Sequence, residues 1–459
     1  MNADLGNFSG MQIEINNAEQ TKTVNLTKDY IYNIESDENY SNGISIKVND
    51  LTIDGHGHSV DADKNARVFN IQANNVILKN LVILNGNSSS YGGAIHWSGL
   101  NGTIINSTIK YSASQYSGGA VYFKNTATVI NSIFTDNYAF FGGAVDFEAK
   151  GKVYNSEFVK NSAKYLGGGI YGVEQTDVYN STFTNNEAGD GGGIYFLSTG
   201  LIEDDIFKNN NAIGYGGAIT NEGYVLIKNS LFLKNTGAYA GAIFFKGNAN
   251  VNNSTFSKNS AKLGGAIYSY CNNAYVFNTE FNHNSAETGN SLYIINKNIE
   301  LSNVTFNNNP SINQKEIYME CNNPKLDNLS FNNVTEKEEL IKNETNTTTT
   351  SNESTDNTSV KTMTKKKTTI TAKSASFKSA KKTKKYTITL KSGKTILKKK
   401  KVTLKLKGKT YTAKTNSKGK ATFKLKITKK GKFSAVIKYK GNSSYKPSKK
   451  TVKIKIKWE

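Results

Sequence analysis

Carboxylates are the residues of this sequence best suited to do chemistry. Glu203, Asp204 and Asp205 stand together in the run GLIEDDIFKNN, and Asp177 precedes them by about two dozen residues. Paired carboxylates, one acting as acid and one as base, are what glycoside hydrolases use to cleave polysaccharides. The candidate catalytic residues for such an activity are therefore Asp177, Asp204 and Asp205. We favour the alternative that they are solvated turn residues, because no arginine lies near them and the neighbouring lysines form no recurring cluster.

Other reactive motifs are absent from the sequence. The run DGHGH at residues 54–58 resembles a pair of metal ligands, but its glycines favour a turn. There is no nucleophile elbow, no zinc-type cysteine spacing and no phosphate-binding glycine loop, because no helical pattern follows the many glycine pairs. The sequence therefore predicts no metal site and no cofactor.

Aromatic residues recur at one position of a repeated segment, two places after the residue that follows each glycine pair. If this position points outward, the rings form an exposed stripe that can stack on sugar faces or on apolar protein surfaces. The alternative is that tyrosine and phenylalanine only suit a strand surface. The candidate binding residues are Tyr122, Tyr171, Tyr195, Phe244, Tyr268 and Tyr293, and His96, Asp146, Thr220 and Tyr318 share their position.

A repeat positions all of these side chains. The residue after the glycine pair stands at 94, 120, 144, 169, 193, 218, 242 and 266, in steps of 24 to 26 residues. A second motif, Asn-Ser-x-Phe-x-x-Asn, travels with it, as at Asn131 and Asn155. Two motifs with one common period are typical of a solenoid. Each unit contains short runs rich in Val, Ile, Phe, Tyr and Thr bounded by Gly, Asn and Asp, which predict strands and turns.

A unit of 24–25 residues has room for about three strands and cannot bury its own apolar face, so the units must stack. The sequence predicts a right-handed parallel β-helix of about 12 coils. The aliphatic residue two places after each glycine pair and the Phe of each F-x-x-N should form two inward ladders. The glycine pair should make a sharp corner with close backbone contacts and positive φ. The closing Asn should occupy a turn, where it can adopt left-handed geometry and pair with stacked copies of itself.

The last 99 residues differ in composition from the rest. Residues 361–459 hold 35 of the 58 basic residues and one of the 36 acids, a net charge of +34, so the remainder carries −12. Runs such as TVKIKIKW alternate lysine with apolar residues, the pattern of half-buried strands in a small β-sandwich. Between the two parts, a Thr/Asn/Ser-rich run predicts a flexible linker. Four domains follow: an N-terminal cap (1–30) with a short amphipathic helix at residues 9–18, a β-helix (31–334), a linker (335–367) and a Lys-rich β-sandwich (368–459).

The repeat GGA[IV] with F-x-x-N resembles that of polymorphic outer-membrane-type surface proteins. The stretch NDLTIDGHGHSVDADKNARVFNIQANNVILKNLVI, residues 49–83, is similar to the first coils of adhesin-like proteins of methanogenic archaea, and the C-terminal residues resemble their bacterial-Ig-like modules. The resemblance covers most of the chain. It implies a right-handed parallel β-helix at the cell surface joined to an Ig-like domain, and it names no ligand.

These observations predict a non-catalytic, adhesin-like protein located outside the cell, although the first residues contain no recognisable leader and no run reaches the roughly 18 apolar residues of a membrane span. The expected partners are cell-wall or host glycans and other cell surfaces. An anionic wall polymer is expected for the Lys-rich domain, with no specific nucleic acid, because reading motifs and arginines are missing. The alternatives are a polysaccharide lyase or glycoside hydrolase of the β-helix type and a structural surface spacer.

Overall fold

The computed structural model describes residues 5–307, 315–332, 367–378, 383–393, 395–407, 409–427, 431–440, 445 and 447–457. The chain divides into two compact units, residues 1–346 and 347–459. The predicted linker, residues 335–367, lies outside the described residues except for Lys367. Within the described part, no helix is both long and apolar enough to cross a membrane.

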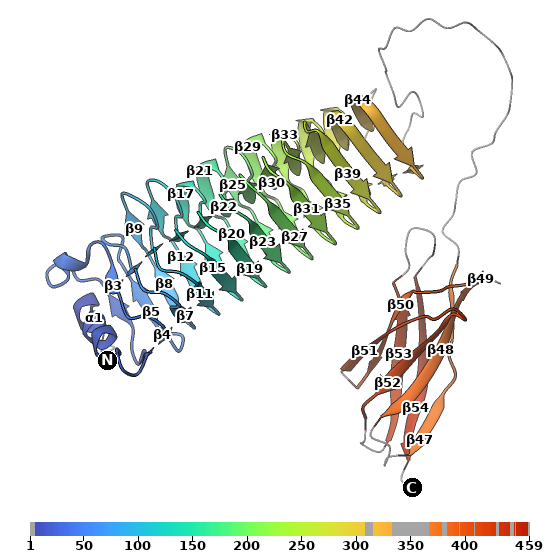
Figure 1. The fold of residues 1–459 in the computed structure, drawn as a ribbon, viewed down its shortest axis with the longest axis horizontal. Helices are drawn as coiled ribbons and strands as arrows, with labels where there is room; N and C mark the ends of the chain where they lie inside the picture. Colours follow the sequence, from blue (N-terminus) through green and yellow to red (C-terminus); the bar gives the residue numbers. More distant parts are fainter. Residues whose placement is uncertain are drawn as a thin grey trace, which may run out of the picture. The chain divides into compact units, whose positions relative to one another are not determined.

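The first unit is a parallel β-helix, as predicted (Figure 1). Successive coils stack in register and build three parallel sheets. The first sheet takes one strand from each coil: β2 (Tyr30–Ile31), β5 (Ser59–Asp61), β8 (Val82–Leu84), β12 (Thr108–Lys110), β16 (Ile133–Thr135), β20 (Glu157–Val159), β24 (Thr182–Thr184), β28 (Ile206–Lys208), β32 (Leu231–Leu233), β36 (Thr255–Ser257), β40 (Glu280–Asn282), β43 (Thr305–Asn307) and β45 (Ser330–Asn332).

The strands of the sheet that we call the third stand just before the glycine pairs in the sequence. They are β9 (Asn87–Ser88), β13 (Ala113–Ser114), β17 (Tyr138–Phe141), β21 (Ser162–Leu166), β25 (Glu187–Ala188), β29 (Asn211–Tyr215), β33 (Thr236–Tyr239), β37 (Ser260–Leu263) and β41 (Ser285–Thr288).

The second sheet follows the glycine pairs and contains β1 (Thr23–Asn25), β3 (Ile44–Ile46), β4 (Thr52–Asp54), β6 (Phe69–Ile71), β7 (Ile77–Lys79), β10 (Ile95–Trp97), β11 (Gly102–Ile105), β14 (Val121–Phe123), β15 (Ala127–Ile130), β18 (Val145–Phe147), β19 (Gly151–Tyr154), β22 (Ile170–Gly172), β23 (Thr176–Tyr179), β26 (Ile194–Phe196), β27 (Gly200–Glu203), β30 (Ile219–Asn221), β31 (Val225–Lys228), β34 (Ile243–Phe245), β35 (Ala249–Asn252), β38 (Ile267–Ser269), β39 (Asn273–Phe277), β42 (Leu292–Ser302) and β44 (Ile317–Asp327).

Both predicted apolar ladders are confirmed. The aliphatic ladder consists of Ile95, Val121, Val145, Ile170, Ile194, Ile219, Ile243 and Ile267, and all of them are buried. The phenyl ladder consists of Phe134, Phe158, Phe183, Phe207, Phe232, Phe256, Phe281 and Phe306, and it is equally buried. Neighbouring rings stack nearly parallel, with centroids 4.6–5.2 Å apart. This spacing is the distance between hydrogen-bonded strands, so backbone pairing and ring stacking favour the same geometry.

A ladder of buried asparagines lines the turn that follows the first sheet. Its members are the closing residues of the F-x-x-N motif, from Asn137 to Asn284; the next predicted member, Asn309, lies outside the described residues. The Oδ1 atom of Asn186 accepts hydrogen bonds from the backbone N and from Nδ2 of Asn161, at 2.9 and 3.1 Å. Nδ2 of Asn186 donates to the Phe158 carbonyl. The amide pairing expected from the sequence is therefore present.

The left-handed geometry expected for the closing asparagines is wrong. It belongs to the residue before each of them, for example Lys160 (φ 53°) before Asn161, and to the first residue of Asn-Ser-x-Phe, for example Asn155 (φ 50°). These first asparagines form a second, exposed ladder at another corner, in which Nδ2 of Asn155 donates to Oδ1 of Asn131. Most coils thus contribute one asparagine to a buried ladder and one to an exposed ladder.

The glycine pairs make the corner between the third and second sheets, as predicted. Gly142 has a φ of 57°, which glycine adopts without strain. Its neighbour Gly143 is required for a different reason, since a Cβ atom there would lie 2.3 Å from the carbonyl oxygen of Gly168 on the next coil. The first glycine therefore turns the chain and the second lets the coils stack.

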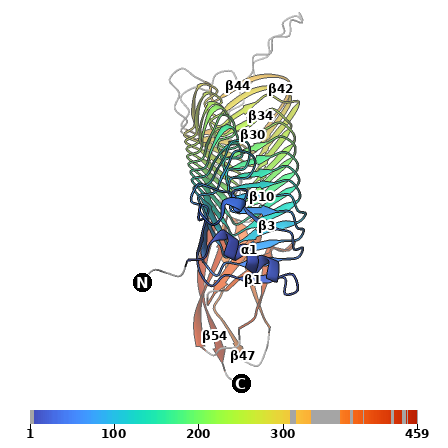
Figure 2. The same cartoon turned by 90° about the vertical axis from the view of Figure 1, so that its left-hand side faces the viewer.

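A helix covers the N-terminal end of the β-helix, which confirms the helix predicted at residues 9–18. Helix α1 (Phe8–Asn17) lies across the first coils (Figure 2) and buries Phe8, Met11 and Ile15. Asn7 accepts a hydrogen bond from the backbone N of Gly10 and caps the helix. A short 3₁₀ helix, η1 (Glu38–Tyr40), follows β2. Solenoid ends need such polar covers because no further coil hides their apolar interior.

The second unit consists of two small sheets around a shared core. Its strands alternate in burial as predicted: in β54, Val452, Ile454 and Ile456 are buried and the lysines between them are exposed. The four-stranded sheet contains β46 (Thr369–Thr371), β48 (Lys384–Ser392), β49 (Thr395–Ile396) and β52 (Lys420–Leu425). The five-stranded sheet contains β47 (Ala375–Lys378), β54 (Ser448–Lys457), β53 (Gly431–Tyr439), β50 (Lys401–Leu406) and β51 (Lys409–Lys414).

Candidate functional site

The candidate site is an aromatic surface at the corner between the third and second sheets of the β-helix. Its inner tier is the predicted position, the middle residue of the short strands that follow the glycine pairs. Backbone pairing aligns its members in the order His96, Tyr122, Asp146, Tyr171, Tyr195, Thr220, Phe244, Tyr268, Tyr293 and Tyr318. The predicted alignment is therefore confirmed.

The predicted exposure of this tier is wrong for three of its aromatic members. Tyr122, Tyr195 and Phe244 have only 8%, 5% and 8% of their surface exposed. They do point away from the apolar interior, but other side chains cover them. Tyr171, Tyr268 and Tyr293 remain partly exposed.

The covering residues form an outer tier that sequence reasoning missed. They stand just before the glycine corner, at or beyond the ends of the third-sheet strands, and comprise Tyr91, Tyr116, Phe141, Tyr165, Tyr215 and Tyr239. The ring of Tyr91 lies 4.7 Å from that of Tyr122, and the ring of Tyr215 lies 4.4 Å from that of Phe244. The sequence did contain a signal for this tier, because an aromatic residue precedes most of the glycine corners by one or two places.

Rings of the outer tier also contact one another along the axis of the coil stack. Tyr91 stacks on Tyr116 at 5.6 Å, Phe141 lies 5.5 Å from Tyr165, and Tyr215 stacks on Tyr239 at 5.0 Å. Four of these tyrosines are well exposed: Tyr91 (42%), Tyr116 (52%), Tyr165 (44%) and Tyr215 (36%). The two tiers together, called the aromatic face below, therefore present solvent with flat rings supported by buried ones.

Arg67, the only arginine, fixes the first turn of this face. Its Nε atom donates to the Gly92 carbonyl, and one terminal nitrogen donates to the carbonyl of Tyr91 and to the hydroxyls of Ser88 and Ser90. Burial lowers the pKa of Arg67 to about 10, so the guanidinium stays charged at neutral pH. Because the cation is held by carbonyls and hydroxyls, its evident role is to position the loop that carries Tyr91.

A group of polar residues interrupts the aromatic face near its middle. The hydroxyl of Tyr195 donates to Oε1 of Glu222 at 2.5 Å, and Nζ of Lys246 donates to the same oxygen at 2.8 Å. Burial opposes ionisation of Glu222, but the hydrogen bonds from Lys246 and Tyr195 outweigh it and lower the pKa. Nearby, Asp190 accepts a hydrogen bond from the backbone N of Tyr215, and burial raises the pKa of its carboxyl. We call Asp190, Glu222 and Lys246 the polar centre.

Asp146 is a buried acid within the inner tier. Burial raises the pKa of its carboxyl to about 8; the hydrogen bond from the Ser117 hydroxyl opposes this shift and the charge of Glu148 adds to it. The second carboxyl oxygen, Oδ1, is buried without a hydrogen-bond partner. Asp146 is therefore mostly protonated at neutral pH and carries little charge onto the face.

The three candidate catalytic carboxylates do not assemble into a site. Asp205 is buried, and its two oxygens accept hydrogen bonds from the backbone N atoms of Ser181 and Glu203, in the place where other coils carry a serine. Asp204 has a φ of 64° at the corner of the exposed asparagine ladder. Asp177 pairs with Leu201, three residues before Asp204, which is about 10 Å along a strand.

No metal centre is evident in the part of the chain that the structure describes, where no three His, Cys, Asp or Glu residues are grouped for a cation. His56, in the run DGHGH, has a φ of 47°, and its backbone N donates to Asp54, so this run is a turn. Burial lowers the pKa of His96, at the start of the inner tier, to about 4, and the charges of Arg67 and Lys124 add to this effect. His96 is therefore a neutral ring stacked on Tyr122.

A comparison with known protein families agrees with a β-helix repeat protein. Residues 180–197 and 253–270 match the Chlamydia polymorphic membrane protein repeat. A solved structure described as "a new PL6 alginate lyase complex with trisaccharide" is similar over 72% of this chain and 84% of that chain, with 12% sequence identity and a TM-score of 0.46. A likeness this distant supports no inference about activity. No curated protein sequence is significantly similar to this chain.

Proposed function

We propose that this chain is a non-catalytic, adhesin-like protein of a cell surface, and that the aromatic face of its β-helix binds glycans. The Lys-rich unit, which we interpret as an Ig-like module, then lies toward an anionic cell-wall polymer. The matched polymorphic membrane protein repeat supports a surface location, as does the resemblance to adhesin-like proteins of methanogenic archaea.

The observation that carries this proposal is the outer tier of exposed tyrosines. Large groups of exposed aromatic residues are uncommon on monomeric proteins and mark binding surfaces. A tyrosine offers a flat ring for the apolar face of a sugar and a hydroxyl for hydrogen bonds, and it loses little conformational entropy on binding. Because the tyrosines recur along the coil stack, they suit an extended chain of sugars better than a single one.

The polar centre adds hydrogen-bonding capacity where the rings are interrupted. Glu222 is partly buried and Lys246 is exposed, and Nζ of Lys246 lies 2.8 Å from Oε1 of Glu222. Such preorganised donors and acceptors can bind sugar hydroxyls with little loss of side-chain entropy. A glycan that lies along the face would then stack on tyrosines on both sides of the polar centre and exchange hydrogen bonds within it.

Replacing exposed tyrosines tests the proposal without damaging the core. A variant with Tyr91, Tyr116, Tyr165 and Tyr215 changed to serine should lose at least tenfold in affinity on a glycan array, since each stacked ring contributes roughly 0.5–1.5 kcal/mol. The matched control changes Tyr111, Tyr138, Tyr224 and Tyr270, which are equally exposed but outside the face, and should bind like the parent.

Three results would contradict the proposal. Undiminished glycan binding by the outer-tier variant would remove the aromatic face from the function. Release of reducing ends or of ultraviolet-absorbing unsaturated products from the bound glycan would instead show an enzyme. A parent protein that binds no glycan on the array would favour a structural spacer.

A further inference from the structure

A cleft in the Lys-rich unit lies between the free edges of its two sheets. Strand β51 is the last strand of the five-stranded sheet, and β52 pairs only with β48 in the four-stranded sheet. The cleft between them has a volume of about 470 Å³ and is lined by Tyr411, Thr412, Ala413, Lys414, Asn416, Lys420, Thr422 and Lys424. Three lysines therefore surround one opening.

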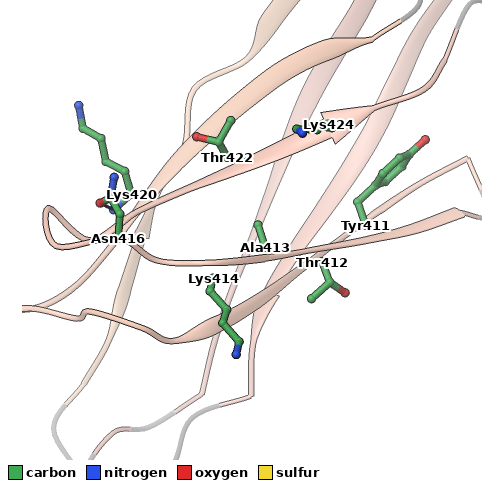
Figure 3. A pocket seen from close by; sticks show the side chains of 8 residues that line it. All are labelled: Tyr411, Thr412, Ala413, Lys414, Asn416, Lys420, Thr422 and Lys424. Carbon is green, nitrogen blue, oxygen red and sulfur yellow. Dashed lines mark hydrogen bonds between the residues drawn. The ribbon is translucent and has the colours of Figure 1, made fainter.

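Both ends of the cleft are fixed by hydrogen bonds. At one end, Oδ1 of Asn416 accepts from the backbone N atoms of Lys418 and Lys420, which closes the turn between the strands. At the other end, the hydroxyl of Tyr411 donates weakly, at 3.5 Å, to the carbonyl of Lys426, beyond β52. Figure 3 shows Asn416 and Lys420 beside the turn and Tyr411 at the far end.

The positive charge of the cleft has no acidic counterpart among the described residues of this unit. Residues 367–457 contain no aspartate and no glutamate. The three lysines that line the cleft therefore attract an anion that enters it, and no neighbouring carboxylate among the described residues competes for them. In Figure 3, Lys414 and Lys420 extend to opposite sides of the opening, an arrangement better suited to an extended chain with repeated charges than to one small enclosed ion.

We infer that this cleft binds a flexible wall-type polymer with repeated phosphate or carboxylate groups. The inference rests on the proposed anchoring role of the Lys-rich unit and assigns that role to one place. The lysines pair with the anionic groups, and Tyr411, Thr412 and Asn416 contact the backbone of the polymer between them. Lysines elsewhere on this unit only raise the local concentration of the polymer.

The test compares two triple variants of the full chain with the same net charge. K414Q/K420Q/K424Q removes the lysines of the cleft, and K453Q/K455Q/K457Q removes three exposed lysines of β54. Affinity is measured against poly(glycerol phosphate), polygalacturonate and single-stranded RNA over a range of salt concentrations. For a flexible polyanion, the slope of the logarithm of the binding constant against the logarithm of the salt concentration becomes less steep by roughly 0.7 for each lysine contact that is lost.

The cleft variant should bind poly(glycerol phosphate) or polygalacturonate at least tenfold more weakly, and its salt slope should fall by about 2. The β54 variant should lose less than threefold, and K414R/K420R/K424R should bind like the parent. The polymer that the parent prefers identifies the source of the anionic group.

Each opposing result has a separate meaning. If both triple variants lost the same affinity for the polymer, the cleft would not be the binding site, and the unit would be anchored by its general surface charge. Tighter binding of RNA than of either polymer would overturn the choice of ligand. A parent protein that retains none of the polymers would refute the proposed anchoring role itself.

Discussion

The two units of this chain obtain specific surfaces from strands in opposite ways. In the β-helix, each position of the coil recurs on the next coil, so a surface residue such as Tyr215 acts as one member of a row. In the Lys-rich unit the strands alternate regularly, but the cleft arises only where two sheet edges meet, at β51 and β52. The aromatic face therefore follows from the period of the repeat in the sequence. The cleft follows from the order in which the strands of the Lys-rich unit pair in its two sheets. Three changes test how independent the two units are.

The largest expected effect follows from interrupting the phenyl ladder. Phe183 is buried and stacks on Phe158 and Phe207 at 4.6 and 4.8 Å. F183A should destabilise the β-helix by about 3–5 kcal/mol, because a large cavity opens between two coils. Chemical denaturation of the full chain should show a lower midpoint for the β-helix and an unchanged transition for the Lys-rich unit. A lowered midpoint in both transitions would mean that the two units unfold together.

A smaller effect is expected from the buried asparagine ladder. N186A leaves the backbone N of Asn161 and the Phe158 carbonyl without their partners. The cost should be about 2–3 kcal/mol, measured by the same denaturation experiment. The control is N155G in the exposed ladder, where glycine accepts the φ of 50° and water can replace the lost amide, so this change should cost less than about 1 kcal/mol. If the two variants lost similar amounts of stability, burial of the amides would contribute little to the stability of the β-helix.

A third effect concerns pH. The pKa of Asp146 is about 8 in the folded protein, above its value of 3.8 in the unfolded chain, so its contribution to stability is fully present below pH 4 and is lost as the pH rises through 8. Asp205 and Glu316, with pKa values raised to about 8 and 7, act in the same direction. His96, whose pKa is lowered to about 4 in the fold, acts in the opposite direction below about pH 6.5, so the β-helix should lose stability between pH 6.5 and 8. The Lys-rich unit should not, because its described residues contain no acid and no histidine.

The threonine variant D146T isolates the Asp146 contribution. Threonine already occupies this position of the coil at Thr220, where its hydroxyl donates to the Tyr215 carbonyl at 2.8 Å. D146T should stabilise the β-helix by about 2 kcal/mol at pH 8 and have little effect at pH 4. Thermal unfolding at both pH values measures this, with exposed Asp136→Asn as the control. A gain of the same size at both values would assign the effect to packing instead.

The sequence alone predicted what the period controls. Ile170, Phe183 and Asn186 recur in register, so their stacking and burial followed from the spacing, and the side of the strand on which Tyr195 lies followed from alternation. The pattern could not show that Tyr195 is covered. The ring of Tyr195 lies 5.9 Å from that of Tyr171 and its hydroxyl donates to Glu222, and such side-chain packing between coils does not follow from the period.

Two other expectations failed for local reasons. Left-handed geometry was assigned to the wrong asparagine because two asparagines of one motif stand at two different corners. The sequence favoured solvated turn residues for the acidic run at Glu203, but Asp205 occupies a buried serine position, where its carboxylate accepts hydrogen bonds from backbone N atoms as the serine hydroxyl does in other coils. The cleft of the Lys-rich unit had no pattern to predict it, because Lys414 and Lys424 belong to strands of different sheets.

Because successive coils have the same structure, the number of coils in the β-helix can change during evolution. Ladder residues in one coil contact the same residue types above and below, so a whole period can be removed or duplicated while both faces of the junction still fit. Removal or duplication of one repeat changes the chain by 24 or 25 residues and the length of the coil stack by about 4.8 Å. The reach of the aromatic face is therefore adjustable in discrete increments, while the terminal helix and the charged module are inherited unaltered.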